Sequence, residues 1–196
     1  MADRMQPAAR RRLLIDATIH CLQREGAHGA TVRKIAAQAG VSPGLVAHHF
    51  SGVEELIELS YRDVASQVGT ILDQAVAAAG PDPWQRLAAY VTGSFAPPVL
   101  DPALLATWVA FWGLTKSSPP IAAVHRAVYR DYRLAVETLL ADCGIEPAER
   151  RLTAIAVTAL VDGLWLELCL DDSVFTAAEA KLIAENWLAS LKRGRR

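Results

Sequence analysis

Cationic side chains are concentrated in the first quarter of the chain. Residues 1–50 contain seven Arg and Lys residues and three Asp and Glu residues, a formal charge of +4, whereas the rest of the chain carries −5. Attraction to phosphate groups depends on local rather than total charge. The net charge of −1 therefore conceals a basic segment suited to a polyanion, with Arg4, Arg10, Arg11, Arg12, Arg24, Arg33 and Lys34 against Asp3, Asp16 and Glu25.

A second group of residues, in the later part of the chain, is aromatic. Trp108 and Trp112 are four residues apart, so they share one face of a helix. Phe111 lies between them, and Tyr129, Tyr132 and Trp165 follow. Such rings form either an ordinary core or the wall of a ligand pocket, and helical spacing alone favours the core for any single Trp.

Patterns typical of catalysis or metal binding give no support for an enzyme. G-x-S-x-G occurs once, at 40–44, but it lies between two short expected helices rather than after a strand, as a nucleophile elbow requires. The chain has no H-E-x-x-H and no Cys with a plausible His partner. Its three cysteines are odd in number, far apart and without a C-x-x-C pair. The sequence therefore predicts no enzyme, disulfide, metal site or cofactor. The scattered histidines and cysteines are expected to be packing or surface residues, namely His20, His28, His125, Cys21, Cys143 and Cys169.

The elements that position these groups are expected to be helices. Apolar residues recur at three- and four-residue spacing, and no segment alternates with period two between turn residues. Gly and Pro residues separate the helical segments. We expect an all-α fold of about nine helices, over 7–25, 32–39, 43–50, 52–79, 84–95, 102–116, 120–142, 148–170 and 177–192.

The second and third expected helices are short and are joined by a turn at Gly40. Thr31 is expected to N-cap the first of them and Ser42 the second. This is the geometry of a helix-turn-helix, which presents its second helix to a major groove about 12 Å wide. Small side chains at Ser42, Gly44 and Ala47 allow that helix to approach DNA closely, and the expected core is Ile35, Ala36, Ala39, Val41, Val46 and Phe50.

The same segment resembles the TetR family of transcriptional regulators. The resemblance rests on the Thr31 cap, the I-A-x-x-A-G-V-S pattern at 35–42, the closing H-F at 49–50 and R-R-x-L-I-D-A-T at 11–18. A helical bundle with a chance helix-turn-helix is the alternative. The resemblance implies that Arg33 contacts guanine or clamps a phosphate, two roles that stay equally open.

Other DNA contacts are implied position by position. Apolar contacts with base edges are expected in the third helix, and phosphate contacts at the hydroxyl and imidazole groups. The full set is Thr31, Arg33, Lys34, Ser42, Pro43, Gly44, Leu45, Ala47, His48 and His49.

The chain departs from the family pattern at two positions. The family often has Tyr where His49 stands, and usually Lys where Val53 stands. Because the missing Lys removes a phosphate contact, we expect weaker or more salt-sensitive binding that depends on Lys34 and the arginines at 10–12.

The aromatic segments T-W-V-A-F-W at 107–112 and V-D-G-L-W-L-E at 161–167 resemble the C-terminal domain of choline-sensing, BetI-type repressors. A quaternary ammonium group has no hydrogen to donate, so its site uses aromatic faces, each worth about 0.5 to 2 kcal/mol, often with a carboxylate. A polyamine or a bulky hydrophobic cation suits the same residues. The resemblance implies an effector site at Trp108, Phe111, Trp112, Tyr129, Asp162, Trp165 and Glu167.

Long apolar runs at 154–170 and 180–191 exceed what one helix face needs for its own core. In the family the two C-terminal helices pair with those of a second copy, which implies a homodimer on a palindromic operator. The alternative is that both helices are buried within one subunit. We expect a DNA-binding domain at 1–52 and an effector and dimerisation domain at 53–196.

The expected mechanism is a population shift in which an effector changes the spacing of the two DNA-binding domains through the helix at 52–79, by way of Leu56 and Ile57. No signal peptide is apparent and no apolar stretch approaches the roughly 20 residues of a membrane span, so a cytoplasmic protein is expected. The basic tail at 192–196 is interpreted as a solvated end. The competing hypotheses are a helical enzyme or ligand-binding protein, and a regulator that acts through protein contacts.

Overall fold

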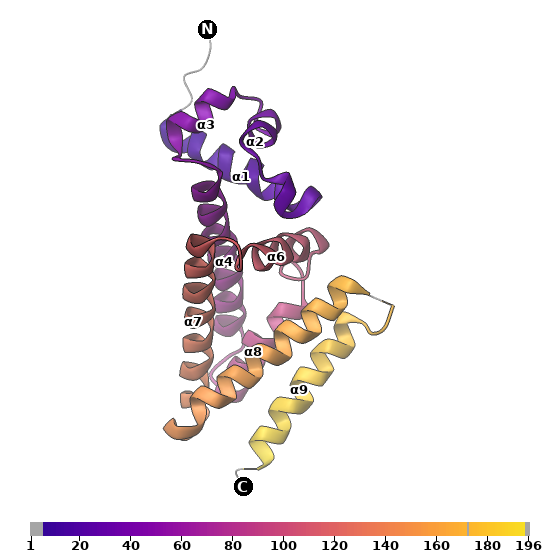
Figure 1. Ribbon diagram of the computed structural model, residues 1–196. Helices are drawn as coiled ribbons and strands as arrows, with labels where there is room; N and C mark the ends of the chain where they lie inside the picture. The colour runs from indigo at the N-terminus through magenta and orange to yellow at the C-terminus, as the bar shows by residue number, and fades with distance from the viewer. Residues whose placement is uncertain (1–5, 172, 195–196) are drawn as a thin grey trace. The chain divides into compact units, whose positions relative to one another are not determined.

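The structure, a computed structural model, describes residues 6–171 and 173–194, which consist of helices joined by short turns and loops (Figure 1). These residues form nine α-helices and two 3-10 helices and contain no strand, so the all-α prediction is confirmed. The charged residues Asp3, Arg4, Arg195 and Arg196 lie outside the described residues. The helices are α1 (Pro7–Glu25), η1 (Gly26–Gly29), α2 (Val32–Gln38), α3 (Pro43–His49), α4 (Val53–Ala78), α5 (Pro83–Thr92), η2 (Gly93–Phe95), α6 (Pro102–Leu114), α7 (Pro119–Asp142), α8 (Pro147–Leu170) and α9 (Ala177–Arg193).

Proline and capping residues determine where these helices begin. Six of the nine α-helices start at proline, whose fixed φ suits the first helical position. The side chain of Thr31 accepts a hydrogen bond from Lys34 N at 3.3 Å, as expected of an N-cap. Thr176 and Glu179 form a capping box at α9. Ser42 occupies the N-cap position of α3, but its side chain accepts no capping hydrogen bond, which corrects the expectation of a side-chain cap there.

Two helices end two or three residues earlier in the sequence than predicted. The helix expected over 84–95 ends at Thr92 and continues as the 3-10 helix η2. A Cβ on Gly93 would lie 2.9 Å from Leu72 Cδ2, so the chain comes close to α4 at this point. The helix expected to reach residue 116 ends at Leu114, whose carbonyl accepts the amides of Ser117 and Ser118 in a turn.

Helices α1, α2 and α3 pack around one apolar core and form the predicted helix-turn-helix (Figure 1). Gly40 has a φ of 66°, and Val41 N donates to Ala36 O at 2.9 Å, a left-handed turn that ends α2 and redirects the chain into α3. The buried core residues are Leu14, Ala17, Cys21, Ile35, Ala36, Val46, Phe50 and Leu56, with Ala39 and Val41 only partly buried against them.

The chain divides into two compact units, each made of two separate stretches of the sequence. One unit joins the chain up to Ala65 with Ala106–Val128, and the other joins Ser66–Leu105 with the chain from Tyr129 onwards. Helices α4 and α7 contribute residues to both units. Helix α4 is therefore part of the same unit as α1, α2 and α3 over its first half.

Helices α8 and α9 lie side by side and carry an exposed apolar surface (Figure 1). By length and composition α8 can cross a membrane, although only 28% of its most apolar window is buried, which corrects the expectation that no stretch approaches that length. The exposed apolar side chains of this region are Leu152, Ile155, Leu170, Val174, Leu182 and Ile183.

Candidate DNA-binding and effector sites

The exposed face of α3 consists almost entirely of small side chains. Gly44 and Ala47 are exposed on this helix, whereas Val46 is fully buried in the core. A Cβ at Gly44 would meet no atom closer than Ser42 Oγ at 4.0 Å, so the position is open towards solvent. This face can approach the floor of a major groove closely, and its exposed residues are Ser42, Pro43, Gly44, Ala47 and His48, with Leu45 half-buried.

The two cations of α2 differ in their surroundings. Arg33 is exposed and forms no ion pair within the described part of the chain. Lys34 is paired with Glu25 of α1, and this ammonium group lowers the pKa of the Glu25 carboxyl. Arg33 is therefore the more available of the two for DNA.

His49 is held differently from its exposed neighbour His48. The two imidazole rings meet edge to face, with centroids 5.1 Å apart. Nε2 of His49 is shielded from solvent and has no hydrogen-bond partner. Burial lowers the pKa of His49, and the positive charges of His48, Arg10 and Arg11 lower it further. The ring must turn outward before Nε2 can contact a phosphate.

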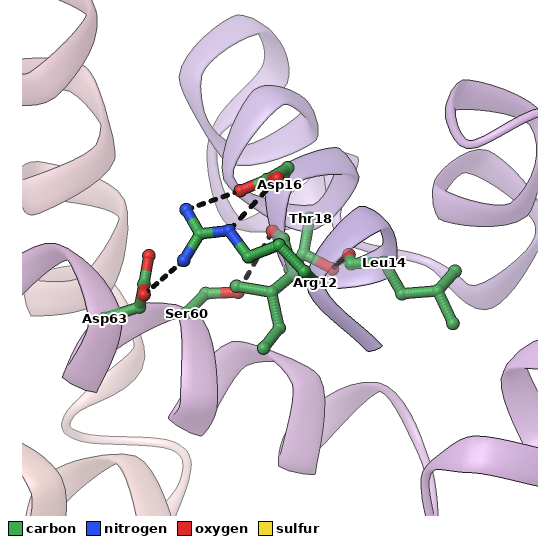
Figure 2. A network of polar contacts seen from close by, with 7 residues as sticks. Arg12, Leu14, Asp16, Thr18, Ser60 and Asp63 are labelled. Atoms are coloured by element: carbon green, nitrogen blue, oxygen red, sulfur yellow. Dashed lines mark hydrogen bonds and ion pairs between the residues drawn. The ribbon is translucent and has the colours of Figure 1, made fainter. Parts of the chain in front are cut away.

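Two of the arginines expected at phosphates are engaged inside the protein. Figure 2 shows Arg12 between Asp16 of its own helix and Asp63 of α4, with Nη1 2.5 Å from Asp63 Oδ1. Arg11 Nη1 donates to the carbonyl oxygen of His49 at 2.6 Å. These contacts join helices, which residue counting along the sequence does not reveal.

The start of α4 is the part of that helix that contacts α1. Leu56 is fully buried in the core of the helix-turn-helix unit, and Ile57 is 6% exposed. One turn later Ser60 Oγ donates to Ile15 O at 3.5 Å, beside the Arg12–Asp63 pair (Figure 2). Helix α4 is thus fixed to α1 by both apolar and polar contacts.

The same turn of α4 carries an aromatic residue that the sequence analysis missed. Tyr61 is fully buried and stacks on Phe111 of α6, with ring centroids 4.2 Å apart and planes inclined by 6°. Trp108 meets Tyr61 edge to face at 5.5 Å. Tyr61 Oη lies 2.9 Å from Nδ1 of His125 in α7, so His125 has a specific polar partner.

Trp108 and Phe111 therefore belong to one aromatic cluster with Tyr61. Trp112, on the same helix, differs from both in its burial and in its polar atom. Trp112 is half-buried, and its Nε1 is shielded from solvent without a hydrogen-bond partner. A buried indole N–H usually finds an acceptor, so Trp112 is the ring of this group whose polar atom is left available to a ligand.

The second unit contains a partly buried carboxylate that is hydrogen-bonded to an aromatic residue. Tyr129 Oη donates to Asp162 Oδ1 at 3.2 Å. Burial raises the pKa of Asp162 to about 6, against the opposing effects of the Tyr129 hydrogen bond and the charge of Arg133. Tyr132, one turn from Tyr129, lies 5.3 Å from the ring of Tyr90, and burial raises the pKa of both phenols.

Trp165 and Glu167 of α8 do not share the surroundings of Asp162 equally. Trp165 is 7% exposed and lies about 60° around the helix from Asp162, whereas Glu167 is exposed and about 140° away. Of the two carboxylates expected in an effector site, Asp162 is partly buried and hydrogen-bonded to Tyr129, whereas Glu167 is exposed.

These groups offer chemistry suited to ligand recognition. A partly buried carboxylate beside an aromatic ring suits an organic cation. Within the described ranges no three His, Cys, Asp or Glu side chains are placed to hold a metal ion.

Two family models match most of the chain. The model described as "Bacterial regulatory proteins, tetR family" matches residues 14–60, and the one described as "BetI-type transcriptional repressor, C-terminal" matches residues 83–193. The HTH-type transcriptional regulator BetI of Serratia proteamaculans (strain 568) is 33% identical over 193 residues, which cover 97% of this chain and 96% of the relative. The BetI regulator of Yersinia pestis (strain Pestoides F) is 34% identical over 188 residues, with 94% and 92% covered.

Solved structures of transcriptional regulators have the same fold as this chain. A transcriptional regulator from Pseudomonas aeruginosa PAO1 has a TM-score of 0.89 and 40% identity, with 97% of this chain and 94% of that chain covered. A regulator from Saccharomonospora viridis, solved in complex with choline, has a TM-score of 0.78 at 18% identity, with 93% and 96% covered. The second likeness concerns the fold alone.

The buried carboxylate should make stability depend on pH. Because the pKa of Asp162 rises to about 6 from 3.8 on folding, the folded protein retains a proton that the unfolded chain releases between these values. The unfolding free energy should therefore fall as the pH rises through this window, by up to about 3 kcal/mol. Asp162→Asn should remove this decline in urea denaturation from about pH 4.5 to 7.5.

Glu167→Gln is the control, since Glu167 is an exposed carboxylate on the same helix. It should keep the pH dependence of the wild type. An Asp162→Asn protein with the wild-type decline would show that Asp162 does not retain the proton.

Proposed function

This chain belongs to the TetR family of bacterial transcriptional regulators, with a C-terminal domain of the BetI type, and we propose that it is a cytoplasmic repressor that binds a palindromic operator as a homodimer and responds to an organic cation. The proposal rests on α3, a helix with small exposed side chains held against α1 and α2. In it, residues 1–52 bind DNA, and residues 53–196 bind the effector and dimerise.

DNA binding is proposed to place α3 in the major groove. The small side chains of this helix leave few groups for hydrogen bonds to bases, so direct base recognition from α3 is limited to apolar contacts such as those with thymine methyl groups. Arg33 supplies the one long, unpaired cation near the start of α2 within the described residues. The proposed contacts are Thr31, Arg33, Lys34, Ser42, Pro43, Gly44, Leu45, Ala47, His48 and His49.

Operator binding is tested with a duplex that the wild-type protein selects from a random-sequence pool. Arg33→Ala should weaken binding to this duplex about tenfold. Lys34→Ala should have a smaller effect, because Lys34 already has a partner in Glu25. Fluorescence anisotropy at several salt concentrations measures both variants.

The same titrations separate the two roles of Arg33. A base contact relaxes the preference at one position of the operator, whereas a phosphate contact weakens binding to all sequences and lowers the salt slope by about one. Unchanged affinity after Arg33→Ala would remove Arg33 from the interface. A wild-type protein that selects no sequence would contradict operator binding itself.

The exposed apolar surface of α8 and α9 supports dimerisation through these two helices. Leu152 is 64% exposed and Leu182 is 54% exposed, on adjacent antiparallel helices. Exposed patches of this kind on a soluble subunit usually bind another protein. A twofold pairing covers the same surface in both copies and explains why α8 is apolar enough to resemble a membrane span.

A charged side chain on this surface should separate the subunits. Leu182→Glu and Ile155→Glu should each sediment as monomers at about micromolar concentration, because a buried unpaired carboxylate is strongly unfavourable. Leu134→Glu on α7 is the matched control, since Leu134 is 51% exposed but lies outside this surface, and it should remain dimeric. Dimers that persist in both surface variants would exclude this interface.

The cationic effector is supported by Asp162 and by its aromatic partner Tyr129 in the same unit. Asp162 has no ion-pair partner at salt-bridge distance, and Tyr129 satisfies only one of its oxygens in the described structure. A bound cation would compensate for the burial of this charge. Choline is the first candidate, because a regulator of the same fold was solved in complex with it. The proposed residues are Tyr129, Asp162 and Trp165 in one unit, and separately Trp108, Phe111 and Trp112 in the other.

Calorimetric titration with choline and with its uncharged carbon analogue, 3,3-dimethyl-1-butanol, tests the cation directly. Choline should bind the wild type, and the neutral analogue should bind at least about tenfold more weakly. Asp162→Asn should lose most of this difference. Equal affinity for the two compounds, or no heat with choline or other amines, would contradict a cationic effector.

The proposed response is a shift between two dimer states. An effector can change DNA binding only by the difference in its affinity for those states, typically about 1 to 3 kcal/mol. Helix α4 is the proposed link, because it contributes residues to both units and contacts α1 through Leu56, Ser60 and Asp63.

A further inference from the structure

We propose that Arg11 is a positioning residue for DNA recognition, which holds the C-terminal end of α3 against α1 and α4 and so determines specificity without touching DNA. The inference rests on the proposed operator binding. It assigns to Arg11 a role different from the phosphate contact that its charge and sequence position suggest.

Arg11 contacts three parts of the corner between α3 and α4. Its Nη1 donates to the carbonyl oxygen of His49 at 2.6 Å. Its guanidinium carbon lies 4.4 Å from the ring centroid of Phe50. Its Nη2 lies 3.6 Å from Glu55 Oε1. One side chain of α1 therefore connects the last residue of α3, the residue after it and the first turn of α4.

Glu55 extends this contact to the beginning of α4. Its other oxygen, Oε2, accepts hydrogen bonds from Ser51 N at 2.7 Å and Ser51 Oγ at 2.9 Å. The two Ser51 hydrogen bonds, and then the charge of Arg11, lower the pKa of the Glu55 carboxyl. Glu55 thus divides its two oxygens between Ser51 and Arg11 and fixes the corner from the α4 side.

The corner needs such a contact because α3 has only seven residues. A helix of this length does not persist in water without tertiary contacts. Val46 and Phe50 anchor its buried side in the core. The carbonyl of His49 is among those that a helix end leaves without a helical partner, and a cation is favourable there. Arg11 therefore fixes the direction in which the exposed face of α3 points.

A guanidinium is the group suited to this role. Its planar donors reach the carbonyl and the carboxylate while its face stacks on an aromatic ring, which the point charge of a lysine cannot do. Arg62 of α4 is exposed, has no ion pair in the described chain and is not among the proposed DNA contacts. It is thus a control with the same charge in the same unit.

The test compares Arg11→Lys with the wild type on the selected duplex and on a scrambled duplex of the same length. Arg11→Lys should bind the selected duplex about tenfold more weakly. Its affinity for the scrambled duplex and its salt slope should not change, because the charge is retained. Arg62→Lys should leave both affinities at the wild-type value.

A second variant and a second measurement make the outcome decisive. Glu55→Gln, which keeps an acceptor for Ser51, should show the same pattern with a smaller loss. The Ser51 amide, which donates to Glu55, should exchange its hydrogen faster in Arg11→Lys than in the wild type.

Three results would overturn the inference. Wild-type affinity for the selected duplex in Arg11→Lys means that a positive charge is sufficient, as in a phosphate contact. Equal losses on both duplexes mean that Arg11 affects only the fraction of folded protein. Unchanged exchange at Ser51 means that Arg11 does not hold the corner. Failure of the wild type to select any sequence is a separate result, which contradicts the proposed function and leaves the exchange measurement as the test of the contact itself.

Discussion

The seven-residue length of α3 is the constraint on which the rest of the DNA-binding unit depends. Because so short a helix cannot hold its own conformation or direction, both must come from its neighbours. Val46 and Phe50 bury its inner side, the Gly40 turn sets its start, and side chains of α1 fix its end. The small exposed residues of α3 are useful for recognition only because these larger residues are placed behind them.

Helix α1 is therefore more than a support for the core. Its apolar face, with Leu14 and Ala17, packs on α2 and α3, while Arg11 and Arg12 on its polar side bind α3 and α4. One turn of α4 contacts α1 on one side and α6 and α7 on the other. Ser60 and Asp63 contact α1, and Tyr61 between them contacts α6 and α7 through Phe111 and His125. A displacement of α6 or α7 at Tyr61 would therefore also move the turn of α4 that contacts α1.

The sequence predicted the parts of this arrangement that follow from periodicity and turn residues. Proline, glycine and Thr31 marked the helix starts, and the apolar spacing identified the core of the helix-turn-helix, because both depend on neighbours within a few residues. The family model over residues 14–60 and the BetI-type model over 83–193 agree with the resemblance found from the motifs.

The partners of long polar side chains were not predictable in the same way. Charge counting made Lys34, Arg11 and Arg12 appear free for phosphate, but their partners Glu25, Glu55 and Asp63 come from distant turns and other helices. Tyr61 gave no signal in the sequence because its partners lie about 50 to 64 residues away. The face of α8 that carries Glu167 was likewise ambiguous, because α8 is apolar on nearly all sides.

The two proposed sites differ in kind. The proposed DNA-binding face consists of small, exposed side chains, whereas the proposed effector site depends on Asp162, a partly buried carboxylate whose pKa is raised by burial to about 6. Both are held by helices whose remaining faces are apolar, and in α8 and α9 part of that apolar surface is left uncovered.

Hydroxyl-radical footprinting of the wild-type protein on the duplex it selects tests the central claim most directly. A dimer on a palindromic operator should protect two half-sites related by twofold symmetry. Their centres should be separated by about one helical turn of 10 base pairs or a multiple of it. A single protected site without symmetry, or no protection at low salt, would contradict it.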